Sequence, residues 1–159
     1  MSLCFLCDKA GEPSRNYPKK GKEMDFEKIR KIRNRDNKFS HMLGVDTQEV
    51  REGYARGVLP VTEICMNINR SVHGGCLYTL ADTMGGAAAC SVHGFRVATL
   101  SGNIEYLRPA MDTKELTCIA EVVKAGKRIN VCETKIYDDK GTLLVIGLFE
   151  YARLKGTYE

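Results

Sequence analysis

The stretch that decides the fold is "NRSVHGGCLYTLADTMGGAAAC", residues 69–90, which predicts a long helix over residues 72–91. Its apolar side chains recur at the i, i+3, i+4, i+7 spacing of one helix face: Leu77, Leu80, Ala81, Met84 and Ala88. The opposite stripe is mostly small and carries a single carboxylate, Asp82. The pattern therefore predicts a helix that packs on a sheet through one face.

Two pairs of glycines interrupt this helix. Each helical glycine costs about 1 kcal/mol relative to alanine, so Gly85 and Gly86 indicate that another backbone, or a thin ligand, comes close there. Gly74 and Gly75 fall in the first turn, where the N–H groups lack intrahelical partners and the helix dipole is positive. That end would favour an oxygen with developing negative charge. Alternatively, these two glycines only permit a tight turn from strand to helix.

Asp82 lies seven residues beyond Gly75, almost on the same face but about 10 Å further along the helix axis. It cannot easily reach a group bound at the start of its own helix. If the two act on one atom, a second copy of the helix must run antiparallel to the first, as in a two-fold dimer with two equivalent sites. The alternative is a surface carboxylate paired with a lysine.

The rest of the chain predicts an α+β architecture. Residues 1–23 have no apolar period and read as a loosely ordered extension before a domain over 24–159. A helix capped by Asp25 follows, with one face marked by Phe26, Ile29, Ile32 and Phe39. Two extended segments flank residues 52–53, the second running through Val58, Val61, Ile64 and Met66. After the long helix come four strand-like runs, over 96–107, 115–124, 128–137 and 142–154.

Composition narrows the class of protein. At 159 residues, 43% apolar and 28% charged, the chain can form one domain without disulfides, and its net charge of +4 is modest. No basic patch interleaved with aromatics suggests nucleic-acid binding, and no stretch approaches the ~18 apolar residues of a membrane span. Seven cysteines, mostly within apolar segments, favour a reducing cytoplasm. Cys4-x-x-Cys7 lacks a second ligand pair, so we predict no metal and no cofactor.

The stretch "NINRSVHGGCLYTLADTMG" from Asn67, followed by "TLSGNIEYLRPA" from Thr99, resembles the PaaI-like acyl-CoA thioesterases of the hotdog fold. The resemblance spans about residues 40–153. It implies a long central helix wrapped by a curved antiparallel sheet, and subunits paired into homodimers that often associate again as homotetramers. One departure is Arg70, where members of this family often carry glycine.

The resemblance also implies roles for individual residues. Asp82 takes the position of the general base or nucleophile, and Gly74 that of the oxyanion donor. Asn67 matches a residue that orients the substrate carbonyl or the attacking water. His73 matches a residue that helps hold the turn and the thioester, with Gly75 beside it, and Thr99 a hydroxyl near the catalytic carboxylate.

The predicted function is therefore hydrolysis of acyl-CoA thioesters, with acyl-CoA as the partner. Phosphate recognition favours cations, so the CoA phosphates are assigned to basic residues near strand ends: Arg108, Lys127 and Arg128. Two alternatives stay open, a hotdog domain that senses acyl-CoA without turnover and a hotdog hydratase of enoyl-thioesters. A cysteine hydrolase is disfavoured because Cys76 and Cys90 lie on the helix body, and His41 and His93 offer no catalytic pairing.

Overall fold

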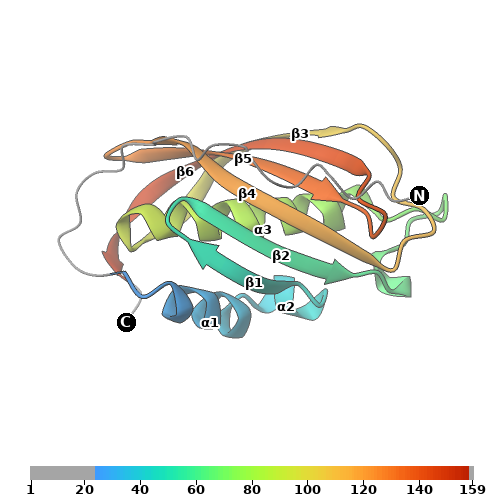
Figure 1. The fold of residues 1–159 in the computed structure, drawn as a ribbon, viewed down its shortest axis with the longest axis horizontal. Helices are drawn as coiled ribbons and strands as arrows, with labels where there is room; N and C mark the ends of the chain where they lie inside the picture. The colour runs from blue at the N-terminus through green and yellow to red at the C-terminus, as the bar shows by residue number, and fades with distance from the viewer. Residues whose placement is uncertain (1–23, 158–159) are drawn as a thin grey trace, which may run out of the picture.

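A computed structural model describes residues 24–157, which form one curved antiparallel sheet wrapped around one long helix (Figure 1). The six strands hydrogen-bond in the order β1-β2-β4-β5-β6-β3. Their bounds are β1 Asp46–Arg51, β2 Tyr54–Pro60, β3 Phe95–Tyr106, β4 Glu115–Ala125, β5 Ile129–Tyr137 and β6 Leu143–Thr157. The predicted helix-in-sheet architecture is confirmed. The predicted extension over residues 1–23 lies outside the described residues.

The central helix, α3 (Gly74–His93), supplies much of the core. From Cys76 to Val92 every residue except Tyr78, Thr79 and Asp82 is buried, so the buried surface is wider than the predicted stripe. The helix ends where Gly94 adopts a φ of +69°, a left-handed conformation that favours glycine. It contacts every strand, and this fixes which side chains of the sheet reach its surface.

The interpretation of Gly85 and Gly86 as a passage for a second backbone or a thin ligand is wrong. A Cβ atom at Gly85 would overlap the hydroxyl of Tyr151 on β6, and one at Gly86 would overlap the guanidinium of Arg33 on α1 (Phe26–Asp36). The two glycines are needed because side chains of this same chain press against the helix at both positions.

The N-terminal helix is shorter than predicted. Asp25 caps α1 as expected, its carboxylate accepting from the Lys28 N–H at 2.9 Å. Asn37 then leaves helical geometry, with φ −81° and ψ 84°, and a separate helix α2 (Lys38–Met42) follows. The break changes the phase of the helix, so Ser40 is buried, while Phe39, expected on the buried face, is 58% exposed.

The second extended segment also ends early. β2 ends at Pro60, which lacks an N–H to continue the sheet. Residues 61–66 instead leave the sheet through a short 3₁₀ helix, η1 (Glu63–Cys65), which leaves Ile64 exposed. The Cys65 carbonyl then accepts from the His73 N–H at 2.7 Å. The segment expected to extend a strand therefore closes a loop in front of α3.

Candidate active site

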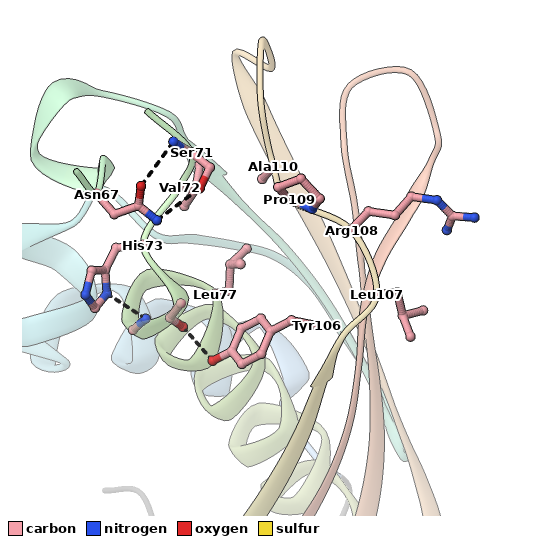
Figure 2. A pocket seen from close by; sticks show the side chains of 12 residues that line it. Asn67, Ser71, Val72, His73, Leu77, Tyr106, Leu107, Arg108, Pro109 and Ala110 are labelled. Atoms are coloured by element: carbon pink, nitrogen blue, oxygen red, sulfur yellow. Dashed lines mark hydrogen bonds between the residues drawn. The ribbon is translucent and has the colours of Figure 1, made fainter. Parts of the chain in front are cut away.

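The turn that leads into α3 is held by the side chain of Asn67. Its Oδ1 accepts from the main-chain N–H of Asn69 at 2.8 Å and of Ser71 at 3.2 Å. Its Nδ2 donates to the Ser71 hydroxyl at 3.0 Å (Figure 2). The chain passes between these contacts through Arg70 at a φ of +59°, the left-handed region that glycine adopts most readily. Arg70 therefore replaces the glycine common in this family at a position whose backbone conformation favours glycine.

His73 is the N-cap of α3. Its Nδ1 accepts from the N–H of Gly75 at 2.8 Å, and its own N–H is bonded to Cys65. A neutral imidazole ring that accepts at Nδ1 carries its proton on Nε2, so this second nitrogen is a donor. The side chain both fixes the first turn of the helix and presents an N–H beside it.

Gly74 presents its own N–H without a partner: among residues 24–157 this N–H donates no hydrogen bond. Its carbonyl accepts from the Tyr106 hydroxyl at 3.0 Å (Figure 2). A Cβ at this position would lie 3.1 Å from that oxygen and 3.2 Å from the ring carbon that bears it. Tyr106 therefore packs directly on Gly74, and the unpaired N–H lies at the positive end of the helix dipole.

These groups line one wall of a cleft of about 560 Å³. The cleft is bounded by the turn before α3 on one side and by residues 106–110 on the other (Figure 2). Its lining is mixed, with Val72, Leu77 and Ala110 among the polar groups already described. Arg108 also borders it, but its guanidinium points away from His73 and donates to the Leu143 carbonyl at 2.9 Å.

Asp82 belongs to a second group, outside the lining of this cleft. The Thr99 hydroxyl donates to its Oδ1 at 2.7 Å. The hydroxyl of Tyr151 lies 2.9 Å from its main-chain carbonyl and 3.3 Å from the same Oδ1. In the described part of the chain no donor reaches Oδ2. The carboxylate is thus held by one oxygen and presents the other.

Sequence reasoning missed Tyr151. It pairs with Thr99 across the β3–β6 register, and cross-strand partners share a face of the sheet. Both hydroxyls therefore point at the same turn of α3. No motif marks Tyr151, and its proximity to Asp82 depends on a strand register that the sequence pattern leaves open.

Within one chain the two groups stay apart. Eight residues of helix separate Gly74 from Asp82, about 12 Å along the axis. Lys127 and Arg128 lie still further away, in the turn between β4 and β5. The His93 ring, at the last residue of α3, is 3.2 Å from the Gly126 carbonyl of that turn. The structure thus brings Asn67, His73, Gly74 and Gly75 together, and Asp82 with Thr99, at separate places.

The other chemically active side chains have structural surroundings. Burial and the neighbouring Cys65 thiol raise the pKa of Cys76 from 9.0 to about 11, which keeps it protonated and a poor nucleophile. His41 is exposed. Between residues 24 and 157 no three histidine, cysteine or acidic side chains are grouped as metal ligands. The same region contains no helix long and apolar enough to cross a membrane.

Comparisons of the sequence with known proteins all indicate the thioesterase superfamily. The model of the thioesterase superfamily matches residues 69–145. The acyl-coenzyme A thioesterase PaaI of Escherichia coli is 32% identical over 115 residues, which cover 72% of this chain and 81% of that protein. The residues matched by the family model include His73, Gly74, Asp82 and Thr99.

Solved structures agree in fold. The structure of the E. coli PaaI protein superposes with a TM-score of 0.76 at 28% identity, covering 83% of this chain and 94% of that one. A hypothetical thioesterase of Streptococcus pneumoniae, solved with coenzyme A, gives a TM-score of 0.66 at 26% identity, covering 71% and 90%. With a helix wrapped by an antiparallel sheet and the His-Gly-Gly turn in place, the chain belongs to the PaaI-like thioesterases of the hotdog fold.

Proposed function

We propose that this thioesterase hydrolyses acyl-CoA thioesters in sites shared between two subunits. The observation that supports the proposal is that α3 presents two functional groups at separate places. The Gly74 N–H, unpaired among residues 24–157, lies in the cleft, and the Asp82 carboxylate has one oxygen without a described donor. These two groups are too far apart to act on the same atom within one chain. The names of two relatives support the substrate class, one an acyl-coenzyme A thioesterase and one solved with coenzyme A.

The sheet offers an edge for such pairing. In the described chain β3 pairs only with β6, so one side of this 12-residue strand has unpaired N–H and C=O groups. Pairing of two β3 edges about a two-fold axis would continue the sheet and set the two α3 helices antiparallel. Asp82 of the partner subunit would then approach Gly74. A dimer is the minimum unit, and a tetramer remains a prediction of the family resemblance.

The same symmetry bears on the CoA phosphates. Lys127 and Arg128 lie beside the C-terminal end of their own α3, far from the cleft of the same chain. In antiparallel pairing, the C-terminal end of one helix is adjacent to the N-terminal end of the other. Lys127 and Arg128 of the partner subunit would therefore lie near the cleft, where their positive charges could bind the CoA phosphates. Arg108 borders the cleft from within the same chain.

In the proposed reaction the thioester carbonyl oxygen accepts a hydrogen bond from the Gly74 N–H, and His73 caps the helix turn that presents this N–H. Oδ2 of Asp82 of the partner subunit either takes a proton from a water that attacks the carbonyl carbon, or attacks that carbon itself to form a mixed anhydride, which a water hydrolyses after the thiolate has left. The C–S bond breaks, and the CoA thiolate leaves with the electron pair of that bond. The free acid and CoA are the products. Asn67 contributes by holding the turn, since its amide oxygen is already used by two N–H groups.

Subunit complementation tests the shared site. Gly74 is the first residue of the helix, a position at which proline is tolerated, so Gly74→Pro removes the N–H without interrupting the helix, and Tyr106 must move by a few tenths of an ångström to admit the added Cβ. Gly74→Pro and Asp82→Asn should each be nearly inactive alone. Mixed and exchanged, about half of the dimers are heterodimers with one intact site of two, so about a quarter of wild-type turnover should return. A site contained in one chain would give no recovery, which would refute the proposal.

A further inference from the structure

Tyr151 is placed to control the Asp82 carboxylate. The side chain is only 1% exposed, at the inner face of β6. Its ring stacks near Phe149, with ring centroids 6.2 Å apart, so it has little freedom to turn away. Gly85 leaves the space through which its hydroxyl reaches the backbone of α3. A buried tyrosine hydroxyl needs a partner, and the Asp82 carbonyl at 2.9 Å would already satisfy it.

The Tyr151 hydroxyl also contacts the side chain of Asp82, because it lies 3.3 Å from Oδ1. The Thr99 hydroxyl donates to that oxygen from the neighbouring strand. Two groups from β3 and β6 therefore engage one carboxylate oxygen, and no donor in residues 24–157 is hydrogen-bonded to the second oxygen. An aspartate on a helix can otherwise rotate about its side-chain bonds. Two contacts from fixed strands restrict that rotation.

We propose that Tyr151 is a positioning residue that, with Thr99, holds the Asp82 carboxylate so that Oδ2 is presented for catalysis. The inference rests on the proposed function, in which Asp82 acts on the thioester. Burial and the nearby negative charge of Asp82 also keep the pKa of Tyr151 well above 10. The hydroxyl thus stays protonated, and able to donate, at any pH at which the enzyme would be assayed.

The test is a comparison of two tyrosines that belong to the same aromatic cluster. Tyr78 packs edge-on against Phe149 at 5.2 Å, and its hydroxyl lies 3.4 Å from the Gly102 carbonyl without contacting Asp82. Tyr151→Phe should lower kcat about 10-fold to 100-fold with KM unchanged, because misplacement of a catalytic group costs turnover rather than binding. Tyr78→Phe should leave both constants unchanged.

A double-variant cycle separates positioning from packing. Thr99→Val should also lower kcat, and the pair Thr99→Val with Tyr151→Phe should lose less than the product of the single losses. Once the carboxylate can rotate, the second hydroxyl has nothing left to fix. Should Tyr151→Phe fail to fold, Gly85→Ala serves instead, since the added methyl would overlap the hydroxyl and crowd the ring carbons next to it, so that Tyr151 must shift away from Asp82. It should show the same loss of kcat.

The outcomes are distinguishable from those for the proposed function. If Asp82→Asn retains wild-type turnover, the assignment of Asp82 fails and this inference fails with it. If Asp82→Asn is inactive while Tyr151→Phe, or Gly85→Ala, has the kcat of the wild type, only the positioning role is overturned. Losses that multiply in the double variant would also overturn it, because they would show that the two hydroxyls act independently.

Discussion

Replacing Arg70 by glycine should stabilise the protein. A residue other than glycine in the left-handed region costs about 1–2 kcal/mol, and Arg70 has a φ of +59°. Glycine gives up part of this gain, about 0.5–1 kcal/mol, through its greater freedom in the unfolded chain. Within residues 24–157 the exposed Arg70 side chain makes no ion pair or hydrogen bond that would be lost. The net gain should be about 0.5–1 kcal/mol.

Urea unfolding followed by circular dichroism, at equal protein concentration, measures this gain. For a chain of this length 1 kcal/mol shifts Tm by about 2–4 °C, so thermal melting should also move upward. The matched control is Asn69→Gly, in the same turn and also exposed but without a positive φ, which should lower stability by about 0.4–1 kcal/mol. If Arg70→Gly lowers the urea midpoint as Asn69→Gly does, the attribution of strain to Arg70 is refuted.

Three further predictions concern the turn and the end of α3. Gly74→Pro should lower kcat about 100-fold to 1,000-fold relative to Gly74→Ala, which keeps the N–H; equal steady-state rates would exclude an oxyanion role. Asn67→Ala should cost about 1–3 kcal/mol in urea unfolding, because the N–H groups of Asn69 and Ser71 lose their acceptor; an unchanged midpoint would contradict it. Burial and, less strongly, Arg153 lower the pKa of His93 below 6.5. The folded state therefore favours the neutral ring, so the stability contribution of His93 is present above pH 6.5 and lost as pH falls through the lowered pKa. Tm should decline less below about pH 6.5 in His93→Gln than in the wild type.

Much of the fold could be predicted because its signals are local. The apolar period of α3 and the turn residues between β4, β5 and β6 placed these elements within a few residues of their observed bounds. The errors arose where one residue ended an element. Asn37 breaks the N-terminal helix and Pro60 ends β2, and in both cases the apolar residues beyond, Phe39 and Ile64, continue the pattern but are exposed.

In the candidate site, too, the residues close together in sequence could be predicted, and one that depends on strand register could not. Asn67, His73 and Gly74 are close in sequence, and the geometry of a capped helix start brings them together. The contact between Thr99 and Asp82 was expected from the family resemblance, and the structure places the two atoms 2.7 Å apart. Tyr151 has no such signal, because it reaches Asp82 only through the register of the last strand. The spacing of residues in a motif cannot predict a contact that depends on strand register.

Gly85 and Gly86 show what a local pattern can and cannot specify. Two helical glycines correctly indicate a close approach, but whether a ligand, a backbone or a side chain approaches depends on residues far along the chain. Here the approaching groups are Tyr151 and Arg33, more than 50 residues away in opposite directions. Since these side chains fill the space beside Gly85 and Gly86, a pantetheine arm cannot pass at these two positions. The proposed thioester site lies elsewhere, at the first turn of the helix, where the cleft opens and the Gly74 N–H has no partner among residues 24–157.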